Sequence, residues 1–141
     1  KNPTNTFAMS LLSEIANRLG HLDDAEFLLE NAVKFKPDDP ELRKKYLLVL
    51  RKRQKFAKTM EQVEILCTKY PNNLSYKVQK AIEVMQNGDH KHAIKLFDEV
   101  IQRVPGNSHA HFYRAFAYKA LRDYEKAAED SPLIHEQFFS H

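Results

Sequence analysis

The 141-residue chain is short of residues that break helices or cross-link a chain: it has three glycines, six prolines and one cysteine, Cys67. A single cysteine excludes an internal disulfide, so we expect a reducing compartment and a cytoplasmic location. No apolar run approaches the roughly 20 residues needed to cross a bilayer, which argues against a membrane partner. Few breakers over this length predict helices with short connections.

Charge of one sign is also lacking, because 22 basic and 19 acidic residues leave a net charge of only +3. This balance does not indicate a nucleic-acid partner, and the basic and aromatic residues lack the interleaving that a single-stranded RNA platform needs. The start of the chain, KNPTNTFAMS, has no signal-peptide layout and no initiator Met. We infer a piece of a longer protein, or a processed one.

Sequence signatures of chemistry are missing as well. The chain has no HExxH, CxxC or GxSxG motif and no glycine-rich phosphate loop. The pairs His90/His92 and His109/His111 are two residues apart, so on a helix their side chains point in different directions. Cys67 is typical of a small buried hydrophobe. We therefore expect no catalytic residue, no metal and no cofactor, and a chain that is not itself an enzyme.

What the sequence does contain is a regular repeat. Four prolines lie on one 34-residue spacing: Pro3, Pro37, Pro71 and Pro105. Two other sets keep the same spacing, one where glycine suits a left-handed helix end and one of small residues that lets helices approach closely. They are Gly20, Gln54, Gly88 and Arg122, and Ala25, Thr59, Ala93 and Ala127.

Each repeat is predicted to hold two helices, which makes the chain all-α. The predicted ranges are 6–18, 23–36, 40–53, 56–70, 75–87, 90–104, 108–121 and 124–130. Pro40 suits a first helical residue, and Ser75 and Ser108 are predicted as N-caps. Pro132 would interrupt the last helix, so we expect that helix to be broken and a divergent tail to follow.

The pattern resembles the tetratricopeptide repeat, whose 34-residue signature combines W-x2-L-G-x2-Y, A-x3-F and Pro. The third unit matches it at Ala81, Val84, Ala93, Phe97 and Pro105. The resemblance covers Pro3 to Asp130 and implies an α-solenoid of antiparallel helix pairs in a right-handed superhelix. It divides the chain into the end of a preceding repeat (1–5), repeats at 6–39, 40–73 and 74–107, a partial repeat (108–130) and the tail (131–141).

The resemblance further implies a protein-binding module or scaffold that holds a partner peptide or protein in a concave groove, lined by the first helix of each pair. Its basic second repeat and its apolar third and fourth repeats suggest an acidic partner with apolar anchors, although a basic run also fits an ordinary solvated face. Tyr118 is expected in the core. The predicted groove residues are Lys44, Lys45, Leu48, Arg51, Val78, Gln79, Ile82, Met85, His109, Phe112, Phe116 and Lys119.

Three narrower hypotheses follow. Family members that bind chaperone EEVD tails use a carboxylate clamp, but Leu48, Gln79 and His109 depart from its Asn, Asn and Lys, so we expect no such binding. The segment from Leu11 to Leu50 resembles the repeat region of bacterial tetratricopeptide-repeat–sulfotransferase fusions, which implies an accessory region of a larger enzyme. A homo-oligomer held by the tail residues Ile134, Phe138 and Phe139 is a further alternative.

Overall fold

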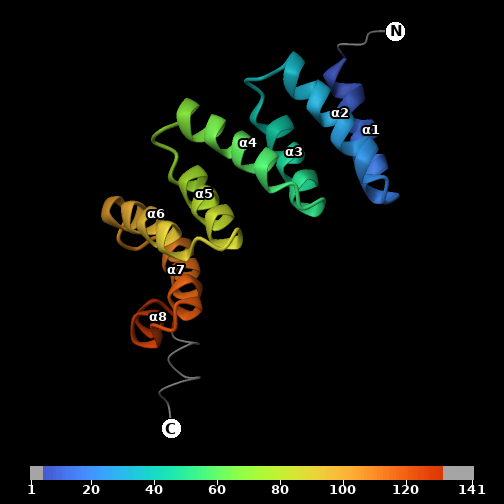
Figure 1. Cartoon of the computed structure of the whole chain (residues 1–141). Coiled ribbons are helices and arrows are strands. Elements are labelled where there is room, and N and C mark those ends of the chain that lie inside the picture. The colour runs from blue at the N-terminus through green and yellow to red at the C-terminus, as the bar shows by residue number, and fades with distance from the viewer. Residues whose placement is uncertain (1–4, 132–141) are drawn as a thin grey trace. The chain divides into compact units, whose positions relative to one another are not determined.

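The computed structural model describes residues 5–131 (Figure 1). Within this range the chain is built of α-helices without strands, as predicted. Every predicted helix is present, and its bounds differ from the prediction by no more than one residue at either end. The helices are α1 (Thr6–Arg18), α2 (Leu22–Phe35), α3 (Pro40–Lys52), α4 (Phe56–Lys69), α5 (Leu74–Gln86), α6 (His90–Arg103), α7 (Ser108–Ala120) and α8 (Tyr124–Asp130).

Side-chain caps fix where most of these helices begin. Asn73 accepts a hydrogen bond from the backbone N–H of Tyr76 at 3.3 Å, and Asn107 accepts one from Ala110 at 2.9 Å. The prediction that Ser75 and Ser108 are the N-caps was therefore wrong. Asparagine and serine are equally good N-caps. The capping residue is therefore the one that lies directly before the first turn of the helix, which is the asparagine in both cases. Asp39 caps α3 in the same way, directly before Pro40.

The turns inside the helix pairs end on a residue in the left-handed conformation. Its φ angle is +82° at Gly20, +57° at Gln54, +100° at Gly88 and +64° at Arg122. The backbone N–H groups around Gly88 close the turn, because Gly88 donates to Met85 and Asp89 donates to Val84. This is the Schellman pattern, and the same pair of hydrogen bonds recurs at the other three turns. The regular spacing of these positions thus reflects one repeated backbone requirement.

We expect Gly88→Ala to lower the free energy of unfolding by about 1 kcal/mol, because a Cβ is strained at positive φ. An added Cβ would meet nothing within 4 Å, so no clash contributes. Gln54→Gly should act in the opposite direction, with a smaller gain because glycine also frees the unfolded chain. Urea unfolding followed by circular dichroism measures both effects. Gly106→Ala is the matched control, since Gly106 has equal space but no positive φ; an equal loss in both alanine variants would contradict the explanation.

The chain divides within α4 into two compact units, residues 1–62 and 63–141. In the first unit, α2 packs against both α1 and α3. Its core joins Ala25, Leu29 and Ala32 of α2 to Tyr46 and Leu50 of α3, with Met9 and Ala16 of α1 at its edge. The small residue at Ala25 is fully buried, which allows the close helix approach that the repeat predicts.

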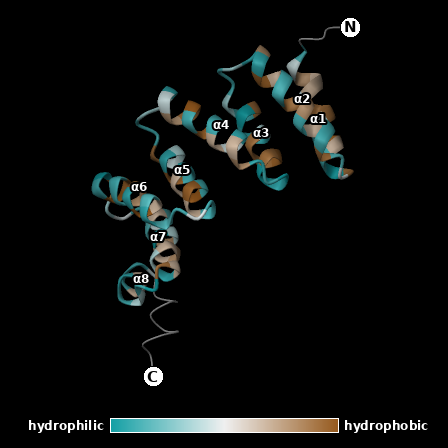
Figure 2. Ribbon diagram, viewed as in Figure 1, coloured by the Kyte–Doolittle hydropathy of each residue, from teal (hydrophilic) through white to brown (hydrophobic). Residues whose placement is uncertain are grey.

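In the second unit, α5 packs on α6, α6 on α7, and α7 on α8. Phe97 and Ala93 of α6 are completely buried. Further along, Ala115 and Ala127 form a small buried cluster, and Tyr118 is partly buried against it. The sequence predicts Tyr118 within the core, whereas it lies at the edge of the core. Figure 2 shows that hydrophobic and hydrophilic residues alternate along the helices, as amphipathic packing requires.

The last described helix, α8, ends two residues before a proline. α8 stops at Asp130, and Ser131 is extended, with φ −143° and ψ 114°. A residue before proline is disfavoured in the helical region, so Pro132 accounts for the conformation of Ser131. The predicted break of this helix is confirmed at Asp130. The predicted tail beyond Ser131 and the end of a preceding repeat at residues 1–4 lie outside the described residues.

Between residues 5 and 131, none of the helices is long and apolar enough to cross a membrane.

Candidate functional site

The first candidate site is a cleft between α5 and α7, both in the second unit. It encloses about 320 Å³, within the size range of small-ligand and peptide-anchor pockets. Both helices are the first of their pairs, which is where the groove was predicted. The structure brings four predicted groove residues together here, namely Val78, Gln79, Ile82 and His109. The remaining lining residues are Ser75, Asn107 and Tyr113.

Gln79 gives this α5–α7 cleft its polar character. Its side-chain carbonyl oxygen is buried and has no hydrogen-bond partner. Buried polar atoms in folded proteins are nearly always paired, because leaving one unpaired costs about 1–3 kcal/mol. The side-chain oxygen of Asn107 is already used, since it accepts the backbone N–H of Ala110. Gln79, which lines the cleft, therefore carries an acceptor that the described residues leave unused.

An aromatic cluster lies on α7 beside the cleft. The ring centroids of Phe112 and Tyr113 are 5.2 Å apart, and those of Phe112 and Phe116 are 5.1 Å apart, both edge to face. Phe112 is 43% exposed and Phe116 is 42% exposed, although residues of this type are usually buried. The edge-to-face contacts hold the rings in place, so the cluster presents a fixed apolar surface next to the polar cleft.

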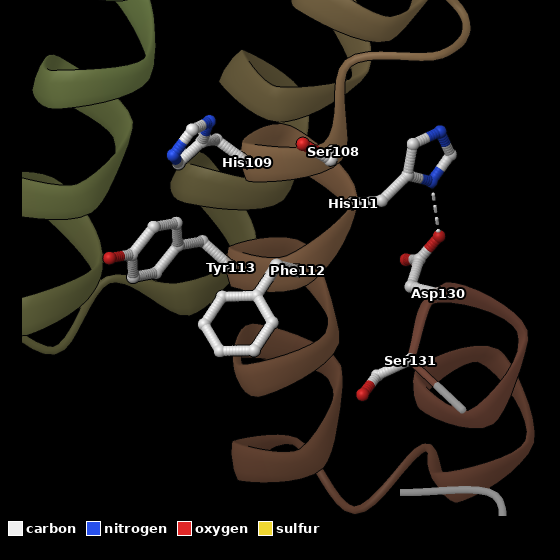
Figure 3. A pocket seen from close by; sticks show the side chains of 7 residues that line it. All are labelled: Ser108, His109, His111, Phe112, Tyr113, Asp130 and Ser131. Atoms are coloured by element: carbon white, nitrogen blue, oxygen red, sulfur yellow. Dashed lines mark hydrogen bonds and ion pairs between the residues drawn. The ribbon is translucent and has the colours of Figure 1, made fainter. Parts of the chain in front are cut away.

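A second hollow of about 550 Å³ lies between α7 and α8 (Figure 3). His109 and Tyr113 line this hollow as well as the α5–α7 cleft. In Figure 3 these two side chains project from one side of α7 toward α5, while His111 projects from the other side toward Asp130. The two hollows thus share two lining residues on the first turns of α7.

The histidine and acid of the second hollow are not arranged for catalysis. His111 Nδ1 lies 2.8 Å from Asp130 Oδ1, and His111 Nε2 lies 2.7 Å from the backbone oxygen of Pro105. Both ring nitrogens therefore face acceptors, which leaves none to take a proton from Ser108 or Ser131. A general base needs a free nitrogen within reach of the proton it removes. The pair instead ties α7 to α8.

Arg114 completes this tie. Its guanidinium donates two hydrogen bonds to Asp130, both at 2.7 Å, and one to Asp98 of α6 at 2.7 Å. These bonds raise the pKa of Arg114, with Asp130 contributing most. Burial by itself would raise the pKa of Asp130, but the hydrogen bonds from Arg114 and His111 outweigh it and lower that pKa. The network keeps one charged arginine between three helices of the second unit.

In the first unit, most cations of the basic helix α3 are engaged within the unit. Lys45 Nζ lies 2.6 Å from Glu14 and 2.7 Å from Ser10 Oγ. Arg43 is buried and donates to the backbone oxygen of Pro37 at 2.7 Å and to Gln62. Lys44 and Leu48 are exposed, and Arg51 is half-buried. The basic run is therefore largely structural, and Lys44 is its clearest surface cation.

Glu26 explains why cations gather at the end of α3. Its carboxylate is buried, with Arg53 at 2.6 Å, Lys58 at 2.9 Å and Lys55 at 3.6 Å. Burial would raise the pKa of Glu26, but the hydrogen bonds from Lys58 and Arg53 lower it. A buried carboxylate needs such partners to remain charged. These basic residues serve the packing of the unit, a use that their spacing alone did not reveal.

Two other predicted groove residues, Met85 and Lys119, are half-buried and lie outside the lining of the α5–α7 cleft. The predicted groove set lacked Asn107, because that position precedes the helix. The sequence does contain a signal for Asn107, because Asn73 and Asn107 occupy equivalent positions of successive repeats and both cap a first helix. As a cap, Asn107 adds a polar side chain to the lining of the cleft.

Metal and thiol chemistry find little support. In residues 5–131 no three His, Cys, Asp or Glu side chains are grouped to hold a metal ion. Cys67 Sγ lies 3.5 Å from the backbone oxygen of Tyr76, and burial raises the pKa of the thiol. A thiol with a raised pKa is a poor nucleophile at neutral pH.

Comparison with known proteins finds a family match over part of the chain and several structures with a similar fold. Residues 84–129 match the tetratricopeptide repeat family model. MamA from Desulfovibrio magneticus RS-1 superposes with a TM-score of 0.74 and 17% identity, over 93% of this chain and 74% of that one. A tetratricopeptide repeat protein from Parabacteroides merdae gives 0.74 and 19% identity, over 94% of this chain and 53% of that one.

YrrB, described as a tetratricopeptide repeat protein with an unusual peptide-binding site, gives a TM-score of 0.67 and 18% identity, over 92% of this chain and 70% of that one. No curated protein matches the sequence. The resemblance to a sulfotransferase fusion stays a prediction. Over the described residues the repeated helix pairs and Schellman turns form the same fold as these tetratricopeptide-repeat structures, and residues 84–129 match the family model in sequence.

Proposed function

We propose that this chain is a protein-interaction module that binds an extended peptide segment of a partner protein in the α5–α7 cleft. The observation that carries the proposal is that Gln79, a lining residue of that cleft, has a buried carbonyl oxygen without a hydrogen-bond partner. The fold places the cleft on the first helices of two pairs. The structural neighbour YrrB has an unusual peptide-binding site, which supports the same class of function.

The chemistry of the cleft indicates what kind of segment fits. An extended peptide presents backbone N–H groups, and one of these can donate to Gln79. The apolar wall formed by Val78 and Ile82 suits an aliphatic side chain. The exposed rings of Phe112 and Phe116 then offer a second apolar contact next to the cleft. A segment with two apolar anchors around a backbone donor matches this surface.

Selection from a displayed random-peptide library should yield peptides that bind the wild-type chain. Against those peptides, Gln79→Met should weaken binding about tenfold, because the substitution keeps the length of the side chain but removes the acceptor. Isothermal titration calorimetry with a selected synthetic peptide measures the change.

Gln102→Met on α6 is the matched control, because Gln102 is exposed and lies outside both hollows. It should bind like the wild type. A library that yields no binder would count against the proposal, and so would equal binding by the two methionine variants. Circular dichroism confirms that each variant is folded before its affinity is compared.

The proposal of an acidic partner is narrower. Lys45 is engaged by Glu14, so attraction of an acidic segment falls mainly to Lys44 in the first unit and Lys119 in the second.

We propose further that the module acts in the cytoplasm, does not bind chaperone EEVD tails and does not itself catalyse a reaction. At its clamp position, the neutral side chain of Gln79 lines a cleft that contains no lysine or arginine among its lining residues. A carboxylate terminus would find weak electrostatic attraction there.

A further inference from the structure

An exposed aromatic pair lies on the solvent side of α2, in the first unit. Phe27 is 67% exposed and Phe35 is 52% exposed. The opposite side of the same helix is buried, with Ala25, Leu29 and Ala32 in the core that α2 shares with α3. Exposed apolar side chains that gather on one face usually mark an interaction surface.

The repeat shows that these two positions face solvent wherever they occur. In the later repeats both positions carry charged residues, all of them exposed, namely Glu61, Lys95 and Glu129 after Phe27, and Lys69 and Arg103 after Phe35. Each of these charged residues follows a complete helix pair, so a preceding pair does not cover the position. The exposure of Phe27 and Phe35 is therefore independent of where the chain begins, and their apolar character needs its own explanation.

The charges around the two rings are segregated along α2. Asp23 and Asp24 lie in its first turn and Lys34 lies in its last turn. Asp23, Phe27 and Lys34 are spaced four and seven residues apart, so they share one side of the helix. Among the described residues, none of these three charged side chains is in an ion pair. Between the rings, Asn31 donates its side-chain N–H to the backbone oxygen of Phe27 at 3.0 Å.

We propose that this face of α2 is the contact surface for a second copy of the chain, with the two α2 helices packed antiparallel about a two-fold axis near Asn31. Position 31 is midway between the rings, so the axis brings Phe27 of each copy to Phe35 of the other. It also brings the acidic start of one α2 toward Lys34 of the other, whereas parallel packing would bring like charges together. The acids at the start of α2 disfavour an anionic membrane as the occupant.

The contact is small, so the dimer should be weak. One helix face buries less than the roughly 1,200 Å² of total surface typical of stable complexes. We therefore expect a dissociation constant of about 100 µM, measured by sedimentation equilibrium of the full chain from about 10 µM to about 1 mM. The proposal does not depend on the peptide-binding proposal, because α2 belongs to the first unit and the α5–α7 cleft to the second.

The repeat supplies a variant that removes the rings with little disturbance. Phe27→Glu/Phe35→Lys gives both positions the charges that Glu61 and Lys69 carry one repeat later, and the net charge of the chain stays the same. This variant should raise the dissociation constant at least tenfold. Phe7→Glu is the matched control, at a ring of the same unit that is 73% exposed, and it should sediment like the wild type. Circular dichroism confirms that each variant is folded.

Two further measurements test the antiparallel arrangement. Asp23→Lys should weaken the dimer several-fold, and adding Lys34→Asp to the same chain should restore it, because the exchange recreates opposite charges across the interface. In a Cys67→Ser chain, Asn31→Cys should form a disulfide-linked dimer on mild oxidation, since the two copies of this position meet near the axis. Glu61→Cys in the same background is the control, at an exposed position of α4, and should cross-link slowly.

Several outcomes would overturn the proposal. A wild-type chain that stays monomeric up to about 1 mM would leave the face to a different protein. A dimer that persists in Phe27→Glu/Phe35→Lys, or that Phe7→Glu dissociates to the same extent, would place the contact elsewhere. Equal cross-linking of the two cysteine variants, or no recovery in the Asp23→Lys/Lys34→Asp chain, would exclude the antiparallel pairing of α2.

Discussion

Replacing Arg114 by Met should lower the free energy of unfolding at pH 7 by about 3–5 kcal/mol, the cost typical of breaking a buried ion pair. The methionine keeps an apolar stem but removes the three hydrogen bonds that join α7 to Asp98 and Asp130. Asp130 is the residue most affected, because its buried carboxylate loses both hydrogen bonds from the guanidinium and retains the one to His111. Urea unfolding followed by circular dichroism measures the loss.

The difference between wild type and Arg114→Met should depend on pH in a defined direction. The pKa of Asp130 is lowered in the folded wild type, so its stabilising contribution is complete above the ordinary aspartate pKa of about 3.9 and is lost as the pH falls through the lowered value. The variant lacks the arginine part of that contribution at every pH. The two unfolding curves should therefore be furthest apart at neutral pH and approach each other in acid.

Two further variants test whether the lost charge pairing is the cause. Arg103→Met removes an exposed arginine of the same unit and should change the unfolding free energy by no more than about 0.5 kcal/mol. Adding Asp130→Asn to Arg114→Met removes the stranded charge and should restore part of the stability. A loss in Arg103→Met as large as that in Arg114→Met, or a gap that stays constant into acid, would show that the network does not act as described.

Phe97→Ala should destabilise the chain by about 3–5 kcal/mol, because the substitution leaves a cavity where a ring is completely buried. Phe97 is the aromatic residue of the repeat signature and lies on α6, which packs on both α5 and α7. The effect should therefore extend to the α5–α7 cleft, since both of its walls rest on α6. Thermal and urea unfolding measure the stability.

Phe112→Ala is the matched control, the same substitution at a ring that is 43% exposed. It should cost about 1 kcal/mol or less, because little apolar surface returns to water. The variant should nevertheless weaken binding of peptides selected on the wild type, since the aromatic cluster loses its central ring. Similar destabilisation by the two substitutions would mean that Phe112 belongs to the core and would remove the cluster from the binding surface.

Much of the fold could be predicted from the sequence because the determinants of helix ends are local. The spacing of Pro37, Pro71 and Pro105 located the repeats, and helix bounds followed to within one residue. The left-handed turns at Gly20 and Gly88 were readable for the same reason, although Gln54 and Arg122 adopt the same φ without being glycine. Asn73 and Asn107 were missed as caps because neighbouring serines satisfy the same chemical rule.

The candidate site was predicted only in part. Repeat position places Val78, Gln79 and His109 on first helices, which was enough to group them as groove candidates. Whether a polar atom is paired depends on neighbours in other helices, so the unpartnered oxygen of Gln79 could not be foreseen. The basic helix α3 shows the limit most clearly, since Lys45 finds Glu14 and Arg43 finds Gln62 across the packing of the first unit.

The sequence by itself determined the helices, their turns and the repeat, because hydrogen-bonded caps, proline and glycine act over a few residues. The tertiary structure decided which charges are neutralised, which apolar faces stay uncovered and which polar groups meet in a cleft. Those outcomes depend on contacts between residues far apart in the chain, as between Arg114 and Asp98 or Lys45 and Ser10. The sequence shows that such residues are present, but only the packing of the helices brings them within hydrogen-bond distance.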